Sequence, residues 1–192
     1  QNYLLPDNFV KMENGKISIA IPKEAGKIDR SFVRVWAVNE WGVSNDALVP
    51  LAKGKVLTKS SEINRHDRHA QIMYFMLVDR FKNGNTANDR PMNRPDVHPK
   101  VDFFGGDLAG LQQVIDDGYF KKLGVNTLWI SPLNQNPDEP YGFYAPKNTK
   151  FSGYHGYWPV SFSLVDDRFG SNQELKDLVS NAHTKDMNIL LD

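Results

Sequence analysis

A loop rich in side-chain oxygens is the first feature of this sequence that could do chemistry. It occupies residues 79–90 (DRFKNGNTANDR) and follows an uncharged apolar run at residues 72–78. Its closely spaced amides and carboxylates include Asn83, Asn85, Asn88 and Asp89. Such oxygens suit Ca²⁺, which takes about 6–8 ligands, and Asp107 in the later FFGGD could complete the set. The same residues favour turns without any metal, so composition leaves both interpretations open.

A second candidate site is the aromatic segment GYHGYWPV at residues 153–160. Its rings come from Tyr154, His155, Tyr157 and Trp158. Aromatic rings stack on the flat CH faces of sugars, and the polar edges of Tyr and His can hydrogen-bond to hydroxyl groups. The pattern fits a sugar platform and a simple cover for the end of a sheet equally well. We interpret the later pair Asp166 and Asp167 as solvated loop and helix-start residues, not as catalytic acids.

The elements that must position these loops alternate in the order β-α-β-α-β. Strands are expected at residues 72–78, 125–130 and 187–191. Helices are expected at residues 108–123 and 171–185. The apolar strands are typical of a parallel sheet buried on both faces. Gly124 ends the first helix, and Ser171 with Glu174 forms a capping box for the second. The alternation predicts a parallel α/β fold.

The connections between these elements differ in length. The loops that follow the first two strands, residues 79–106 and 131–168, are long, whereas the connections that follow the helices are only a few residues. In a (β/α) barrel the loops at the carboxyl ends of the strands build the active face. A doubly wound sheet obeys a similar rule. Both folds therefore predict that the two long loops carry function.

The first part of the chain, residues 1–57, has a different pattern. Short β-like runs alternate with turn signals, and the pair Asn14-Gly15 is typical of a hairpin. The segment at residues 32–47 (FVRVWAVNEWGVSNDA) resembles the last strands of a fibronectin type III-like module. We predict an all-β sandwich piece of the immunoglobulin or fibronectin type here. The polar, charged residues 58–70 predict a linker.

Composition narrows the function classes. The 23 basic residues balance the 23 acidic ones, which argues against a nucleic-acid partner. No apolar run is long enough for a transmembrane segment. The chain has no Cys, so disulfides and thiolate metal sites are excluded. The 40% hydrophobic content is that of an ordinary globular protein.

The second half of the chain resembles the α-amylase family of glycoside hydrolases. The shared motifs, in that family's order, are YFMLVDRF, the Asn-rich loop, GGDLAGL, LGVNTLWISPL, GYHGYWPV, FGSNQELKDLVSNAH and NILLD. They cover residues 71–192. The resemblance implies a multi-domain protein in which the β-sandwich piece precedes the first part of a (β/α)₈ TIM barrel.

The resemblance also implies a structural Ca²⁺. In the subgroup that contains cyclodextrin glycosyltransferases and neopullulanase-like enzymes, a loop of this form followed by GGD binds the ion. The implied ligands are Asn83, Asn85, Asn88, Asp89, Gly105 through its carbonyl, and Asp107. This chain has Asn83 where an Asp is common, which lowers the ligand charge.

Three residues match substrate-binding positions of the resembled family. Tyr157 matches the tyrosine that stacks on the glucose at subsite −1, and His155 matches a histidine near the same sugar. Asp192 matches a supporting aspartate of that subsite at the end of the third strand. The nucleophile, the acid/base and the stabilising carboxylate of the family belong to later strands, so no catalytic residue is expected within this chain.

These inferences lead to one expected function and two alternatives. A (β/α)₈ barrel needs about 250 residues, so we expect the sequence to be part of a longer protein, truncated after the third strand. The parent is expected to be a retaining hydrolase of α-1,4-glucans such as starch, maltooligosaccharides or cyclodextrins. We expect a bacterial protein located outside the cytoplasm: periplasmic, secreted or on the cell surface. The alternatives are a transglycosylase on the same scaffold and a non-catalytic glucan-binding or scaffold protein.

Overall fold

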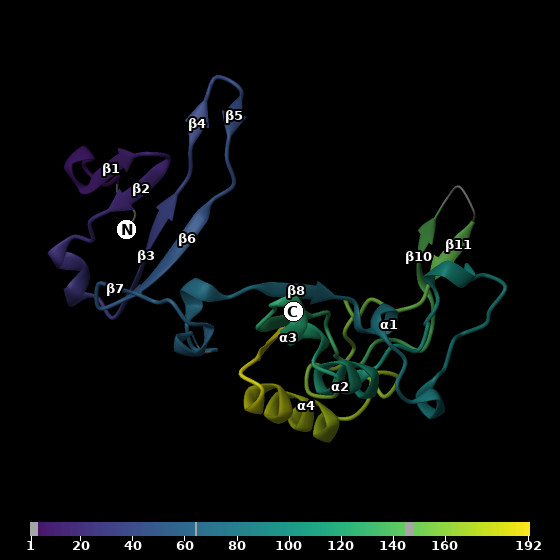
Figure 1. Ribbon diagram of the computed structural model, residues 1–192. Helices are drawn as coiled ribbons and strands as arrows, with labels where there is room; N and C mark the ends of the chain where they lie inside the picture. The colour runs from purple at the N-terminus through teal and green to yellow at the C-terminus, as the bar shows by residue number, and fades with distance from the viewer. Residues whose placement is uncertain (1–3, 64, 145–147) are drawn as a thin grey trace. The chain divides into compact units, whose positions relative to one another are not determined.

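The computed structural model describes residues 4–63, 65–144 and 148–192. The chain divides into two compact units, Gln1–Ala70 and Gln71–Asp192 (Figure 1). The division falls where the sequence predicts the start of the α/β half. Among the described residues, no helix is both long enough and apolar enough to cross a membrane.

The first unit consists of short antiparallel strands. One hairpin joins β1 (Val10–Glu13) and β2 (Lys16–Ile19), and another joins β4 (Val38–Asn39) and β5 (Gly42–Val43). A sheet in the order β3-β6-β7 contains β3 (Arg30–Val35), β6 (Ala47–Ala52) and β7 (Lys55–Val56). The 3₁₀ helices η1 (Asp7–Phe9) and η2 (Lys23–Lys27) precede and follow the first hairpin.

Turn chemistry explains the first hairpin. Asn14 and Gly15 have φ angles of 51° and 72°, the left-handed values that this pair favours, so the predicted hairpin is confirmed. Within the segment at residues 32–47 that resembles fibronectin-type strands, β3 ends at Val35 and β4 begins separately at Val38. Among the described residues of this unit, Leu51 is the only fully buried apolar side chain. The small sheets establish β structure, and the sandwich stays a prediction.

Residues 58–70, for which the sequence predicts a linker, belong to the first unit. They contain the 3₁₀ turns η3 (Ser60–Glu62) and η4 (Arg68–Ala70). The buried Asp67 forms an ion pair with Arg30 of β3. The segment is therefore fastened to the three-stranded sheet by a charge pair of which one member is buried.

The second unit is built on a parallel sheet in the order β12-β9-β8. Its strands are β8 (Met73–Met76), β9 (Thr127–Ile130) and β12 (Asn188–Leu191). Between β8 and β9 lie α2 (Leu108–Asp116) and α3 (Tyr119–Leu123), and between β9 and β12 lies α4 (Asn172–Thr184). The predicted parallel β-α-β-α-β order is confirmed. Consecutive strands are neighbours, which is the arrangement of a (β/α) barrel.

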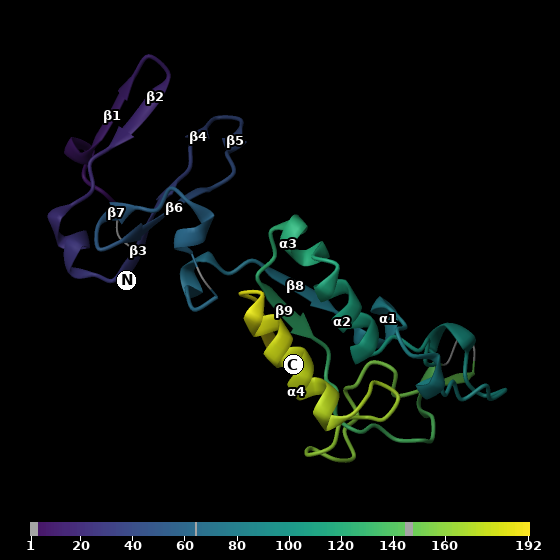
Figure 2. The same ribbon diagram turned by 60° about the horizontal axis from the view of Figure 1, so that its bottom comes forward.

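The helices cover one face of this sheet (Figure 2). Leu128 and Ile130 of the central strand are fully buried in a core shared with the helices. The helical side chains in that core are Leu108, Leu111, Ile115, Phe120, Leu178 and Ala182. Ser171 caps α4 as predicted, because its Oγ accepts a hydrogen bond of 3.2 Å from the backbone N–H of Glu174.

The opposite face of the sheet is open to solvent. Phe75 and Trp129 lie there with ring centroids 5.0 Å apart, and they are 46% and 37% exposed. Leu190 of the neighbouring strand is also exposed. The prediction that the three strands are buried on both faces is therefore wrong for this chain. The described helices all pack on the other side, and apolar composition alone cannot tell which face is covered.

The helix expected at residues 108–123 is broken at Asp117-Gly118. Gly118 has a φ of 69°, and its N–H donates to the carbonyl of Ile115, which ends α2 before α3 begins. The apolar spacing continues through the break, so periodicity predicts one helix where there are two. Gly124, with a φ of 81°, ends α3 as predicted.

The two long loops leave the sheet at the carboxyl ends of their strands, as predicted. The first contains α1 (Val78–Phe81) and the 3₁₀ turns η5 (Thr86–Asn88) and η6 (Pro99–Val101). The second contains the hairpin of β10 (Tyr141–Tyr144) and β11 (Thr149–Phe151). An isolated β-bridge between Val97 and Lys150 is one of the contacts that join the two loops.

The core predicts the effect of removing one ring. Phe120 is fully buried and contacts the rings of Tyr74 and Phe81. Phe120→Ala is expected to lower the free energy of unfolding by about 3–5 kcal/mol, because it leaves a cavity in the packed interior. Urea denaturation followed by tryptophan fluorescence measures the change.

Tyr119 provides the matched control, since it precedes Phe120 on the same helix and is 47% exposed. Tyr119→Ala is expected to cost less than about 1 kcal/mol. Equal losses in the two variants would contradict the assignment of Phe120 to the core.

Candidate functional site

The oxygen-rich loop folds so that two of its predicted ligands face each other. Asn83 lies just after α1, and its amide donates hydrogen bonds of 2.8 Å to both carboxylate oxygens of Asp89. The side-chain Oδ1 atoms of Asn83 and Asn88 are buried and have no hydrogen-bond partner among the described residues. Buried carbonyl oxygens without partners are costly, so they mark a place where a cation or a water is expected.

Gly105 forms one wall of this cluster. Its φ is 87°, and a Cβ at this position would lie 2.4 Å from Oδ1 of Asp89 and 2.6 Å from Nδ2 of Asn83. Glycine is therefore needed both for the backbone conformation and for the close approach. The side chains of Asn83 and Asp89 and the backbone of Gly105 are together in space, and the cation site stays a prediction.

Asn85 and Asp107 have well-defined roles in holding the loop. Asp107 is buried and caps α2, and its carboxylate accepts hydrogen bonds from the N–H groups of Gly110, Gly84 and Asn85 at 2.6, 2.9 and 2.9 Å. The side chain of Asn85 accepts from the N–H of Ala87. Three of the roughly four acceptor positions of the Asp107 carboxylate are thus already used within the chain.

The donor set fits a hard cation. Amide, carboxylate and backbone oxygens are the ligands of Ca²⁺, and the cluster contains no sulfur or imidazole ligand. Among the residues that the structure describes, no three His, Asp or Glu side chains are grouped to hold a metal. A cation at this position would depend on neutral amide oxygens, with Asp89 as the charged ligand beside them.

Two contacts that the sequence analysis missed fix the loop. Gly84 and Gly110 approach so closely that a Cβ on Gly84 would lie 2.2 Å from the backbone nitrogen of Gly110. Asp79 is buried, and its carboxylate accepts from the N–H groups of Phe104 and Gly105. Burial raises the pKa of Asp79 to about 6, against the opposing effect of these hydrogen bonds and of Arg80. Gly84 lies in the Asn-rich loop and Gly110 in the GGDLAGL motif, and these two glycines were the signal in the sequence for this close packing.

The aromatic loop and the end of the third strand come together. The Tyr157 hydroxyl donates a 2.5 Å hydrogen bond to the carboxylate of Asp192, which directly follows β12. The rings of His155 and Tyr157 are stacked with centroids 5.8 Å apart. All three predicted substrate-binding residues therefore lie in one cluster, although Asp192 is 35 residues from Tyr157. Tyr157 is 48% exposed, which leaves part of its ring open to a ligand.

His155 has a defined tautomer in this cluster. Its Nδ1 accepts a 2.9 Å hydrogen bond from the N–H of Tyr157, so the neutral imidazole carries its proton on Nε2. Burial lowers the pKa of His155 below its usual value and favours this neutral form. The hydrogen bond to Asp192 raises the pKa of Tyr157, which keeps the phenol protonated. The cluster therefore offers Nε2–H as a donor and the Asp192 carboxylate as an acceptor to a hydroxylated ligand.

A buried ion pair helps to hold the aromatic loop in place. Arg168 contacts Asp166 through Nε and Nη2, both at 2.8 Å, and Asp166 also accepts from the N–H of Asn136. Asn136 is buried, and its side chain accepts from the N–H of Trp158 at 2.9 Å. Asp166 is therefore a buried structural residue, and its interpretation as a solvated loop residue is wrong. The adjacency of Asp166 and Asp167 in the sequence did not indicate the hydrogen bond from Asn136, which lies 30 residues away.

Asp167 differs from its neighbour. It is exposed and forms an ion pair with Arg90, which lowers the pKa of Asp167. The two adjacent carboxylates thus have separate cationic partners. Neither of them shares a hydrogen bond or ion pair described here with Tyr157, His155 or Asp192. They are not an acid/base pair in this structure.

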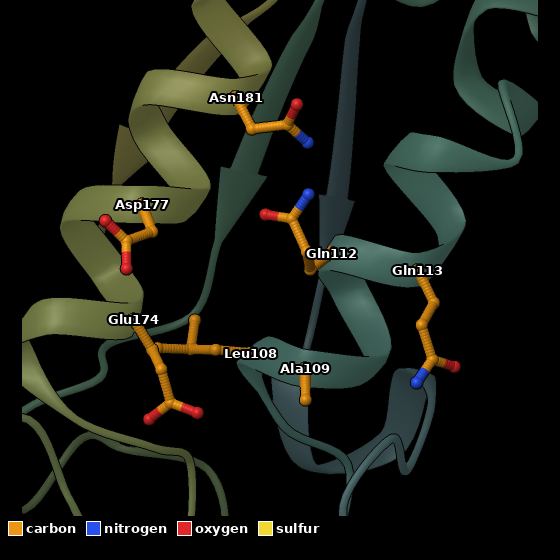
Figure 3. Close-up of a pocket in the computed structure, with 7 residues that line it drawn as sticks. All are labelled: Leu108, Ala109, Gln112, Gln113, Glu174, Asp177 and Asn181. Atoms are coloured by element: carbon orange, nitrogen blue, oxygen red, sulfur yellow. The ribbon is translucent and has the colours of Figure 1, made fainter.

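A groove lies between α2 and α4 (Figure 3). It has a volume of about 490 Å³, and its lining residues are Leu108, Ala109, Gln112, Gln113, Glu174, Asp177 and Asn181. Gln112 and Asn181 both donate to Asp116, so the polar groups near this groove are already paired within the chain. A second hollow of about 270 Å³ includes Asp192 in its lining and is the one that touches the predicted site.

The neutral state of His155 predicts a pH dependence. Because its pKa is lowered in the folded chain, the stability that the neutral imidazole contributes is fully present above the ordinary histidine pKa of about 6.5. That stability is lost as the pH falls through the lowered value, when the Nδ1 acceptor becomes protonated. Thermal unfolding between pH 7.5 and pH 5, compared in wild type and His155→Gln, is expected to show a growing relative loss in wild type at acid pH. A stability difference that does not change with pH would contradict this assignment.

The comparisons with known proteins match the same part of the chain. Residues 75–192 match the family model of the alpha amylase catalytic domain. The cyclomaltodextrin glucanotransferase of Paenibacillus macerans is 30% identical over 161 residues, which cover 80% of this chain and 22% of that protein. The periplasmic alpha-amylase of Escherichia coli K12 is 37% identical over 128 residues, which cover 66% of this chain and 19% of that protein.

A solved structure gives the same result. The gamma-CGTase of the alkalophilic Bacillus clarkii superposes with a TM-score of 0.55 and 29% identity, covering 64% of this chain and 18% of that one. The chain thus spans about a fifth of the length of these relatives. The family match includes both loops, β9, β12 and the last two residues of β8. This chain belongs to the alpha-amylase family.

Proposed function

We propose that this chain is part of a retaining glycoside hydrolase that acts on α-1,4-glucans such as starch, maltooligosaccharides and cyclodextrins. The observation that carries the proposal is the cluster of Tyr157, His155 and Asp192. It combines an exposed aromatic ring with a neutral imidazole and a carboxylate, which together suit the CH face and the hydroxyl groups of one sugar ring. It lies at the carboxyl ends of the strands, where barrels build their active sites.

The fold proposed for the parent is a (β/α)₈ barrel preceded by an immunoglobulin- or fibronectin-like sandwich. Two features support the barrel: consecutive strands are adjacent, and the helices all lie on one face. In a barrel the open face of Phe75 and Trp129 would be the packed interior. The sandwich is supported by the antiparallel strands of the first unit.

The proposed chemistry needs two carboxylates about 5–5.5 Å apart, a nucleophile and an acid/base. We assign neither role to a residue of this chain. The structural carboxylates Asp79, Asp107 and Asp166 are occupied by hydrogen bonds, and Asp192 contacts Tyr157. This 192-residue chain alone is therefore proposed to bind glucan without cleaving it.

Transfer to a sugar acceptor is the second candidate reaction. It is favoured by the similarity to the cyclomaltodextrin glucanotransferase of Paenibacillus macerans. Hydrolysis and transfer share the same sugar platform and differ in the acceptor that attacks. A non-catalytic glucan-binding protein is the remaining alternative, and it would use the same cluster of Tyr157, His155 and Asp192.

A structural Ca²⁺ is part of the proposal. The ligands proposed are Asn83, Asn85, Asn88, Asp89, Gly105 through its carbonyl, and Asp107. The buried Oδ1 atoms of Asn83 and Asn88 and the close approach of Gly105 support this site. When bound, the ion would supply positive charge that holds the loop closed.

The proposed location is outside the cytoplasm of a bacterium, in the periplasm, at the cell surface or in the medium. The similarity to the periplasmic alpha-amylase of Escherichia coli K12 supports it. Ca²⁺ sites of moderate affinity suit such compartments, where the ion is abundant.

The calcium site is tested by adding one methyl group. Gly105→Ala places a Cβ against Asp89 and Asn83, so it is expected to weaken Ca²⁺ binding about tenfold or more, a loss of about 1.4 kcal/mol per factor of ten. Calorimetric titration with Ca²⁺ measures the affinity.

The control is Gly118→Ala, because Gly118 also has a positive φ but would meet no atom within 4 Å. Gly118→Ala carries a similar backbone cost of about 1–2 kcal/mol. It does not alter the oxygen-rich loop. Equal Ca²⁺ affinity in Gly105→Ala and wild type would contradict the assigned site.

The sugar platform is tested with maltoheptaose. Tyr157→Ala is expected to weaken binding of maltoheptaose by up to about tenfold, since stacking on an aromatic ring contributes about 0.5–1.5 kcal/mol. Tyr119→Ala is the control, because this exposed tyrosine lies on α3, which leads into the amino end of β9. Calorimetry or fluorescence titration measures the affinity.

Three outcomes separate the candidate functions. Binding without release of reducing sugar is expected for this chain, and activity restored in a longer protein would support the enzyme. Release of reducing sugar by the 192-residue chain would show that one of its own carboxylates is catalytic. No binding of maltoheptaose by wild type would argue against the platform.

A further inference from the structure

The Arg80 guanidinium lies between two aromatic rings that belong to different loops. Its Cζ is 3.7 Å from the ring centroid of Phe104 and 4.0 Å from that of Tyr154. Its edge donates 2.8 and 3.3 Å hydrogen bonds to the carbonyls of Asp102 and Lys100. Its Nε lies 3.2 Å from the buried carboxylate of Asp79. One side chain thus contacts two aromatic rings, two backbone carbonyls and a buried carboxylate.

On one side, this stack adjoins the oxygen cluster. Phe104 directly precedes Gly105, whose backbone lies against Asp89 and Asn83. The N–H groups of both Phe104 and Gly105 donate to Asp79, which fixes this short strip of backbone. A movement of Gly105 therefore moves the ring on which Arg80 lies.

On the other side, the stack adjoins the sugar platform. Tyr154 contacts His155 edge to face with centroids 5.3 Å apart, and His155 stacks on Tyr157. The same loop is fastened to the segment beside Phe104, because Ser152 donates from its N–H and its Oγ to the carbonyl of Val101. The orientation of Tyr154 thus bears on the two rings expected to meet the sugar.

We propose that Arg80 is a positioning residue that couples the oxygen cluster to the aromatic platform, so that Ca²⁺ binding orders the sugar-binding rings. The inference rests on the calcium site and the glucan platform proposed above. Arginine suits this role because a planar, delocalised cation stacks on two rings while its edge donates to carbonyls. Lysine would keep the charge beside Asp79 and lose both the flat stacking surface and the forked donors. Coupling between two ligands is reciprocal, so maltooligosaccharide binding also tightens Ca²⁺ binding.

The test follows the platform directly while Ca²⁺ is added. The ring signals of His155 are recorded by NMR in wild type and in Arg80→Lys, and His155→Gln identifies the signal among the five histidines. Ca²⁺ is expected to shift the His155 signal in wild type. Arg80→Lys is expected to bind Ca²⁺ with an affinity close to that of wild type and to lose most of this shift. A residue with only a general stabilising role would lower the melting temperature and leave the shift intact.

Two further variants keep the test decisive. Phe104→Leu removes the ring that Arg80 contacts on the calcium side and leaves Arg80 itself unchanged. This variant is also expected to lose the His155 shift. Arg94→Lys is the matched control, because Arg94 also joins the two loops, through an ion pair with Glu139, and has no cation–π contact with any described ring. It is expected to retain the shift. Should Arg80→Lys fail to fold, Phe104→Leu against Arg94→Lys carries the same comparison.

Maltoheptaose titrations distinguish this inference from the proposed function. Ca²⁺ is expected to tighten maltoheptaose binding about fivefold or more in wild type, and Arg80→Lys is expected to lose this gain. Ca²⁺ binding without a His155 shift, or an equal shift in Arg80→Lys, would overturn the inference even where maltoheptaose binds. A shift that depends on Arg80 in a chain that binds no maltoheptaose would support the coupling and overturn the glucan proposal. Absence of Ca²⁺ binding in wild type would overturn the coupling.

Discussion

Buried carboxylates that accept hydrogen bonds from loop backbones are the interaction on which the second unit depends. Asp79 accepts from Phe104 and Gly105, Asp107 from Gly84, Asn85 and Gly110, and Asp166 from Asn136. Asp102 accepts from Met92 and Asn93 in the same way. Long loops lack the ladder partners of helices and strands, so their buried N–H groups need other acceptors. A charged acceptor is stronger than a neutral one, and losing it leaves several donors unsatisfied together.

This constraint separates the acidic residues into two groups. The carboxylate of Asp107 accepts three backbone hydrogen bonds, and that of Asp166 accepts from backbone groups and from the Arg168 side chain, so both residues hold loops in place. Asp89 and Asp192 instead face side chains from other parts of the site and remain partly exposed. Carboxylates of the second group keep acceptor capacity for a cation or a hydroxyl group. The function of an acidic residue here follows from what already occupies its oxygens, and residue type alone does not reveal it.

Local signals predicted much of the fold, and long-range contacts account for the errors. Asn14-Gly15, the Ser171 cap and Gly124 act within a few residues, and all three were predicted correctly. The break at Gly118 was missed because the apolar periodicity continues across it. The hydrogen bond from Asn136 to Asp166 and the contact of Gly84 with Gly110 depend on how loops fold back, which spacing does not encode. The family motifs pointed to the Tyr157 cluster because the fold brings matched positions together. Composition alone left that site open.

The order of the proposed sugar platform depends on an edge strand of the sheet. β12 pairs on one side only, with β9, and its residues Leu190 and Leu191 are about half exposed. Asp192 follows directly and is held to the sheet by the hydrogen bond of its N–H to the carbonyl of Ile130. Tyr157, by contrast, sits in a loop braced by Asn136 and by the stacked His155. An edge strand frays more easily than a central one, so the Tyr157–Asp192 contact is limited by the Asp192 side. Packing on the free edge of β12 or on the open sheet face would therefore hold Asp192 more firmly beside Tyr157, without any new contact to a bound sugar.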